Sequence, residues 1–145
     1  MEQEAAQRLV AEAAREVRRG ASAEGTSGSH VVTLVNAILD TALAENATDI
    51  HLEPMGGRLR IRMRVDGLLR ERPIQFPTEL APVIIARLKV MAGLDTAKRN
   101  RPQDGQIRYR MGERSIDMRV AVLPVVDGER MVVRIMDAAG RFLSC

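Results

Sequence analysis

A chain of 145 residues is long enough for one ordinary domain with its own core, and its 46% hydrophobic and 28% charged residues are typical of a globular protein. The formal charge of +3 excludes a polycation, no apolar run approaches the ~18 residues of a membrane span, and the N-terminus lacks the apolar region of a secretory signal. Cys145 is the only cysteine, which excludes an internal disulfide framework, so the sequence predicts a soluble cytoplasmic protein.

The first thirty residues fall into two parts. Residues 1–19 are predicted to form a helical arm, because Leu9, Ala13 and Val17 recur at a spacing of four. Residues 20–30 consist mostly of Gly, Ser, Ala and Thr, which is typical of a flexible linker. We therefore expect the first helix to be a separate arm or the end of an upstream module.

Two further helices are predicted, at 31–49 and 78–93. The first carries a broad apolar stripe at helical spacing. In the second, Thr78 is the predicted N-cap, Pro82 falls in the first turn and Gly93 ends the helix.

Short alternating runs bounded by turn residues predict six strands. They are 49–54, 58–65, 68–73, 105–111, 114–123 and 129–136. Asp66-Gly67, between the second and third runs, is the strongest short hairpin signal. The order helix, three strands, helix, three strands with short loops predicts an α+β fold, a mixed and mostly antiparallel sheet with helices packed on one face.

Arginine is concentrated on one face of the predicted strands. The run 58–65 alternates apolar residues with Arg58, Arg60, Arg62 and Arg64. In the last hairpin, a turn at Asp127-Gly128 would place Arg134 opposite Ala121 and make Arg119 its diagonal neighbour, roughly 7–8 Å away. Two guanidinium groups at that separation can reach one anion.

The pattern leaves a plainer interpretation open. Asp117, Glu129 and Glu113 are near enough in sequence to engage these arginines in ordinary surface salt bridges, which contribute little to stability. Arg119, however, has only small or apolar neighbours at 118, 120 and 121, and this favours a specific anionic partner.

Signs of catalytic chemistry are few. Asp49, His51 and Glu53 share one strand face and could bind a metal, although such a row is more often a hydrogen-bonded structural histidine. No Gly-Lys dipeptide occurs, so the sequence contains no Walker A loop, and the chain by itself is not expected to be an enzyme.

Four blocks in this order resemble the ATPases that drive type II secretion and type IV pilus assembly. The blocks are "ATDIHLEP" (47–54), "LRIRMRVDGLLRE" (59–71), "ARLKVMAGLDTAKRNRPQDGQIRYRMGERSIDMRVAVLP" (86–124) and "GERMVVRIMD" (128–137). The resemblance implies that 31–137 is the PAS-like domain preceding the RecA-like ATPase core. It also implies that 138–145 is a tail toward a core lying beyond this chain. ATP and magnesium would belong to the full-length protein, with no cofactor expected for this chain alone.

The resemblance also implies roles for particular residues. Arg119 in "DMRV" and Arg134 in "VVRIMD" match the family's arginines that reach the terminal phosphate of ATP held by the core. In the family's hexameric ring this domain touches the core of the next protomer, so an inter-subunit contact is expected for Arg60, Arg62 and Arg64. The "RPQDG" turn, 101–105, is expected to be structural.

The resemblance further predicts partners and a location. The RecA-like core of the same or a neighbouring protomer and the inner-membrane platform of the machine would be the partners, and the protein would be cytoplasmic and peripheral at the inner membrane. Two departures from the family pattern, Lys98 and Asn100, put in doubt any salt bridge made by their loop.

The competing hypothesis is a nucleic-acid-binding domain that uses the arginine-lined sheet. The near absence of stacking aromatic residues and the small net charge disfavour it. A PAS-like small-molecule sensor is a third alternative, for which the sequence shows no convergent polar cavity.

Overall fold

The computed structural model describes residues 3–19 and 30–136; the expected linker, except for His30, and the expected tail, 138–145, lie outside them. The helices are α1 (Gln3–Arg18), α2 (His30–Ala44) and α3 (Ala81–Met91), with a short 3₁₀ turn η1 (Thr78–Leu80) before the last. The strands are β1 (Asp49–Met55), β2 (Arg58–Val65), β3 (Leu68–Glu71), β4 (Phe76–Pro77), β5 (Gln103–Met111), β6 (Arg114–Val125) and β7 (Gly128–Met136).

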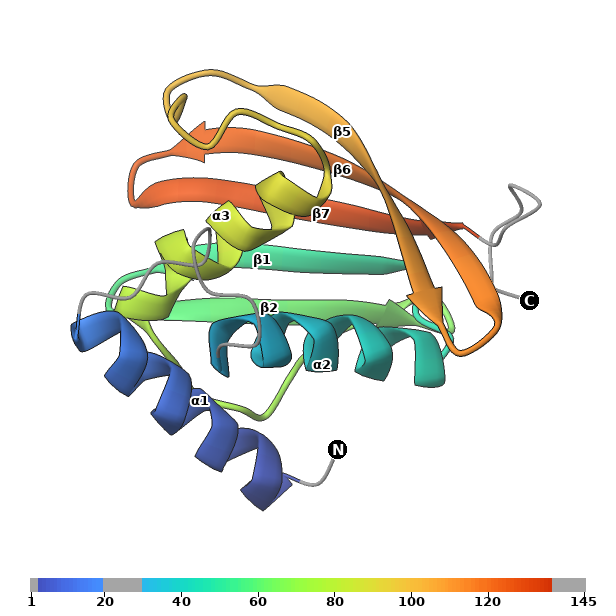
Figure 1. The fold of residues 1–145 in the computed structure, drawn as a ribbon, viewed down its shortest axis with the longest axis horizontal. Coiled ribbons are helices and arrows are strands. Elements are labelled where there is room, and N and C mark those ends of the chain that lie inside the picture. Colours follow the sequence, from blue (N-terminus) through green and yellow to red (C-terminus); the bar gives the residue numbers. More distant parts are fainter. Residues whose placement is uncertain (1–2, 20–29, 137–145) are drawn as a thin grey trace.

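All seven strands belong to one open sheet, in the order β3-β2-β1-β7-β6-β5 with the short β4 beside β2. Figure 1 shows the run from β2 through β1, β7 and β6 to β5. Every pair is antiparallel. The predicted Asp66-Gly67 hairpin is confirmed: Val65 pairs with Leu68, and both turn residues have positive φ, as a two-residue type I′ turn requires. The pairing of β1 with β7 joins the two halves of the chain into this single sheet.

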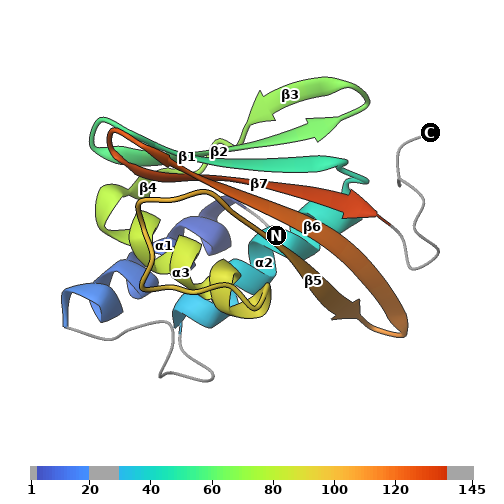
Figure 2. The same cartoon turned by 90° about the horizontal axis from the view of Figure 1, so that it is seen from above.

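The three helices cover one face of the sheet and leave the other bare (Figure 2). Alternation along the strands explains this, since the apolar residues of β2 (Leu59, Ile61 and Met63) are buried toward the helices while its arginines point to the other side. The second helix contributes a matching buried stripe of seven residues. The predicted α+β fold with helices on one face is confirmed. We call the bare side of the sheet the outer face.

The first helix is packed against the rest of the domain. Val10, Ala13 and Ala14 of α1 are buried in the same core as α2, and Arg18 forms an ion pair with Glu79 at 3.1 Å. The helix that the sequence set apart as an arm therefore shares the hydrophobic core of the sheet domain.

Local signals at helix ends were only partly informative. Thr78 does not cap a helix: it opens the 3₁₀ turn, and α3 begins after Leu80 without a side-chain cap. The predicted end of α3 is confirmed, with Gly93 at φ +72° just beyond it. The second helix stops at Ala44, five residues earlier than predicted, because Asn46 takes a left-handed conformation.

The "RPQDG" segment is partly strand rather than turn, because β5 starts at Gln103. At Gly105 the backbone of β5 passes so close to the end of α3 that an added Cβ would lie 2.8 Å from the carbonyl oxygen of Ala92. The glycine thus permits close packing of the strand on the helix end, a structural role of the kind expected.

None of the helices in the two described stretches combines the length and the apolar character that a membrane crossing requires.

Candidate functional site

Two arginines of the closing hairpin stand directly opposite each other on the outer face. Arg119 of β6 pairs in register with Arg134 of β7, and both side chains are exposed. Their chain neighbours Met118, Val120 and Val133 are buried toward the helices, which fixes the arginines on the opposite side.

The predicted register was wrong by two residues. The two-residue turn is Val126-Asp127, with Val125 paired to Gly128, so Arg134 faces Arg119 and not Ala121. The correction brings the two arginines closer, since directly opposite Cβ atoms on a sheet are about 4.5–5.5 Å apart while diagonal ones are farther.

Arg134 is held from the neighbouring strand. Its Nε donates to Oδ1 of Asp49 at 3.2 Å. The other carboxylate oxygen accepts from Thr48 Oγ1 at 2.9 Å and lies 3.5 Å from Nε of Arg64. Asp49 is therefore a buried carboxylate shared by arginines of the two strands that flank β1.

Arg119 has no comparable partner. Its side chain makes no hydrogen bond or ion pair within residues 3–19 and 30–136. Two of the three carboxylates considered as its partners are engaged elsewhere: Asp117 pairs with Arg108 at 3.1 Å and Glu129 pairs with Lys89 at 2.7 Å.

Each arginine of β2 lies near a carboxylate of the same sheet. Glu53 of β1 is 2.8 Å from Arg62, 3.3 Å from Arg60 and 3.8 Å from Arg130, and Arg58 pairs with Glu71 of β3. The basic row seen in the sequence thus lies against a row of carboxylates on its neighbours. The inter-subunit contact expected for Arg60, Arg62 and Arg64 stays a prediction.

His51 lies between these groups on β1, paired with Arg62 on one side and Val132 on the other. Burial lowers the pKa of His51 below its ordinary value, against the opposing effect of Asp49 and Glu53. Arginines occupy both carboxylates of the predicted row, and no group of three metal-ligating side chains occurs in the described part of the chain.

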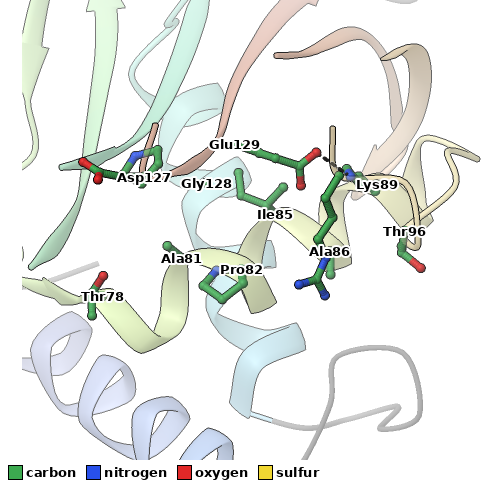
Figure 3. A pocket seen from close by; sticks show the side chains of 12 residues that line it. Thr78, Ala81, Pro82, Ile85, Ala86, Lys89, Thr96, Asp127, Gly128 and Glu129 are labelled. Atoms are coloured by element: carbon green, nitrogen blue, oxygen red, sulfur yellow. Dashed lines mark hydrogen bonds and ion pairs between the residues drawn. The ribbon is translucent and has the colours of Figure 1, made fainter. Parts of the chain in front are cut away.

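A pocket of about 340 Å³ lies beside α3 and the β6–β7 turn (Figure 3). Ala81, Pro82 and Ile85 line its apolar side, and the ion pair of Lys89 with Glu129 lies at its edge. Sequence reasoning missed this pair. The sequence did contain a sign of it: Lys89 lies four residues after Ile85, on the apolar stripe of its helix, in a chain with only two lysines.

The fold and the outer face together define an α+β domain with an open antiparallel sheet, helices on one side and a pair of facing arginines on the other. The family model described as type II/IV secretion system protein matches residues 24–145, so the chain belongs to that family.

Relatives with curated names support this family assignment. The chain is 51% identical over 112 residues to type II secretion system protein E of Pseudomonas aeruginosa, and 44% identical over 115 residues to type II secretion system ATPase E of Vibrio cholerae. These matches cover 77% and 79% of this chain and 22% of each relative. Type IV pilus assembly ATPase PilB of Pseudomonas aeruginosa is 43% identical over 131 residues, which is 90% of this chain and 23% of the relative. The chain therefore spans about a fifth of the length of these relatives.

Among solved structures, the crystal structure of the pilus retraction motor PilT with bound ADP has a similar fold. The TM-score is 0.50 at 18% sequence identity, over 70% of this chain and 28% of that one.

Proposed function

We propose that this domain is a nucleotide-proximal, non-catalytic module of a hexameric secretion or pilus-assembly motor ATPase. In this proposal Arg119 and Arg134 contact the phosphates of an ATP molecule held by the RecA-like core of the same or a neighbouring protomer. The core supplies the phosphate cradle and the magnesium ion. The assembled motor works in the cytoplasm against an inner-membrane platform.

The observation that carries the proposal is the direct pairing of Arg119 with Arg134. Like charges directly opposite each other on a sheet are destabilising. Four other arginines of the outer face lie opposite carboxylates: Arg64 opposite Asp49, Arg60 opposite Glu53, Arg62 opposite Glu71 and Arg108 opposite Asp117. Arg134 also has Asp49 opposite it on its other side, whereas Arg119 has Gln106 there. An anion between Arg119 and Arg134 would offset their repulsion, and planar guanidinium groups suit phosphate oxygens.

The chemical role follows from the charge of the reacting phosphate. Negative charge spreads over the equatorial oxygens of the transferred phosphoryl group, and fixed cations aimed at it stabilise the transition state. Two arginines from a module outside the core would make hydrolysis depend on how the modules are docked.

A chimera tests the assignment. Residues 24–145 replace the matching segment of the Vibrio cholerae ATPase E, and steady-state ATP hydrolysis is compared with that of variants. Arg119→Ala and Arg134→Ala should each lower kcat by ~10²–10³-fold, the usual cost of one charge-stabilising donor. Arg108→Ala, an exposed arginine of the adjacent strand on the same face, should leave kcat within about twofold because Asp117 already engages it. Unchanged rates in both test variants would contradict the proposal.

The second part of the proposal is an inter-subunit contact through Arg60, Arg62 and Arg64. Each also touches a carboxylate of β1, so charge reversal would disturb the sheet as well as any interface. Glutamine at all three positions is the milder change. It should weaken association of the chain with the separately expressed core of the same relative, measured by sedimentation, without changing the thermal midpoint by more than a few degrees. Equal association would refute this contact.

The competing nucleic-acid function has no stacking platform to support it, because the chain holds only two phenylalanines and one tyrosine and no tryptophan. The arginines of β2 are also held in ion pairs with Glu53, Glu71 and Asp49 of the same sheet.

A further inference from the structure

We propose that the pocket beside α3 and the β6–β7 turn is a docking site for an exposed peptide segment of a partner protein. The segment inserts an aliphatic side chain and carries an acidic residue on one side of it and a basic residue on the other. The site is separate from the facing arginines, because Glu129 at the pocket and Arg134 lie five residues apart on β7, about 17 Å along the strand. Its occupancy does not depend on the proposed nucleotide contact.

The size and the lining of the pocket suit an aliphatic side chain. Its volume of about 340 Å³ lies within the range of ligand pockets, roughly 300–1,000 Å³. The apolar wall consists of four residues of α3 and one from the end of β1: Ala81, Pro82, Ile85, Ala86 and Pro54. Such a wall favours an aliphatic group over water, since burying apolar surface lowers the free energy.

The two ends of the pocket carry opposite charges. Asp127, in the β6–β7 turn, lies at the end where α3 begins, whereas Lys89 and Thr96 lie at the other end (Figure 3). Arg99 belongs to this second end, because the carbonyl of its neighbour Lys98 accepts from Lys89 Nζ at 3.1 Å. The side chains of Arg99 and Asp127 form no hydrogen bond or ion pair within residues 3–19 and 30–136. A segment with an anion at one end and a cation at the other complements this arrangement.

The ion pair at the wall of the pocket offers hydrogen bonds to a peptide backbone. Lys89 is 1% exposed, and its ammonium group uses two of its three donors, on Glu129 Oε2 at 2.7 Å and on the Lys98 carbonyl. Oε1 of Glu129 has no partner in the described part of the chain. A peptide backbone provides an acceptor and a donor in almost every residue, so it complements an ammonium N–H beside a carboxylate oxygen.

Exposed apolar residues continue from the mouth of the pocket. Val126, next to Asp127 in the turn, is fully exposed, and Met55, next to Pro54, is 37% exposed. The two segments are adjacent, since a Cβ added at Gly128 would lie 3.8 Å from Cγ of Pro54. An apolar patch that extends beyond a pocket is typical of protein-binding surfaces, in which weaker contacts surround a buried anchor. This favours a peptide segment over a small ligand enclosed by the pocket.

A random peptide library displayed on phage is the probe, selected on the immobilised 145-residue chain. The selected peptides should share an aliphatic residue flanked by one acidic and one basic residue, and labelled synthetic copies should bind the chain in fluorescence polarisation. Ala86→Phe places an aromatic ring in the pocket and should weaken this binding by at least about tenfold. Thermal unfolding identifies a misfolded variant, and the smaller change Ala86→Leu then takes its place.

Two arginines of one loop provide a matched pair of variants. Arg99→Glu should weaken binding of the same peptides by about two- to fivefold, the range of one exposed ion pair. A second selection on Arg99→Glu should yield peptides in which a basic residue replaces the acidic one. Arg101 is exposed in the same loop but does not line the pocket, so Arg101→Glu should leave binding within about twofold.

Three results would overturn the docking site. One is a selection that enriches no sequence on the wild type above the level on Ala86→Phe. Another is a set of selected peptides that bind the wild type and Ala86→Phe equally, since they would then occupy a different surface. The third is self-association of the wild-type chain in sedimentation that Ala86→Phe abolishes, because the occupant would then be a second copy of this chain.

Discussion

The buried ion pair of Lys89 and Glu129 offers a sharp test of the described packing. Lys89 is 1% exposed, and its Nζ donates to Glu129 Oε2 at 2.7 Å and to the carbonyl of Lys98 at 3.1 Å. The pair ties the end of α3 to the start of β7 and to the loop before β5. Glu129→Gln removes the negative charge with little change in shape and leaves the ammonium group buried without its counter-ion.

The expected cost follows from that burial. Removing one partner of a buried ion pair typically costs about 3–5 kcal/mol. The glutamine oxygen and the Lys98 carbonyl can still accept hydrogen bonds, so the lower end, about 3 kcal/mol, is expected. For a domain of this size that loss corresponds to a fall in Tm of about 10 °C. Lys89→Met should cost less, about 1–2 kcal/mol, because Glu129 is 10% exposed and borders the pocket, where water can reach it (Figure 3).

Urea unfolding of the 145-residue chain measures these differences. The double variant Lys89→Met/Glu129→Leu is the control, because replacing a buried pair by apolar groups of similar volume is often neutral, and it should return to within about 1 kcal/mol of the wild type. A Glu129→Gln chain within 1 kcal/mol of the wild type would refute the reasoning, since Lys89 would then have access to solvent.

Three further changes test other parts of the fold. Burial lowers the pKa of His51, so the unfolded chain binds a proton before the folded one does. Stability should therefore fall as pH drops through about 6.5, and His51→Gln should lack that part of the slope in urea midpoints taken from pH 7.5 to 5.5; parallel curves would contradict this. Tyr109 Oη donates to Asp40 at 2.7 Å, and burial together with this bond raises the pKa of Tyr109. Ultraviolet titration of this single tyrosine should show ionisation well above that of free tyrosine, and Tyr109→Phe should cost about 1–2 kcal/mol. Gly105→Ala should cost about 1–3 kcal/mol in the same unfolding assay, because its Cβ would press on a backbone oxygen, whereas Gly56→Ala, where a Cβ meets nothing within 4 Å, should be nearly neutral.

The elements with strong local signals were predictable from the sequence. Alternation placed the long strands, and Asp66-Gly67 located the turn between β2 and β3 to the residue. The last hairpin shows the limit of such signals. Asp127-Gly128 is the same dipeptide, yet Gly128 pairs with Val125 and the turn falls one residue earlier, because the pairing along the whole of β6 and β7 decides the register.

Features that depend on distant parts of the chain were not predictable. The contact of Asp49 with Arg134 joins residues 85 apart and exists only because β1 pairs with β7. The packing of α1 could not be inferred either, since a Gly- and Ser-rich stretch gives no information on where the preceding helix lies. Lys89 is a charged residue in the core, and only the position of Glu129 on another strand explains it.

Replacing one of the two facing arginines should have opposite effects on stability and on function: the domain should become more stable while ATP hydrolysis should fall. Arg119→Gln removes a like charge opposite Arg134 without removing any bond to residues 3–19 or 30–136, so the free energy of unfolding of the chain should rise by about 0.2–1 kcal/mol. Arg108→Gln breaks the pair with Asp117 and should not stabilise the chain. The gain should shrink at high salt, because screening weakens repulsion between exposed charges. If Arg119→Gln stabilises the domain and also lowers hydrolysis in the chimera, the fold keeps an unfavourable pair that the reaction needs. A destabilised Arg119→Gln chain would mean that this arginine supports the sheet itself, and the argument for a phosphate between the two side chains would lose its basis.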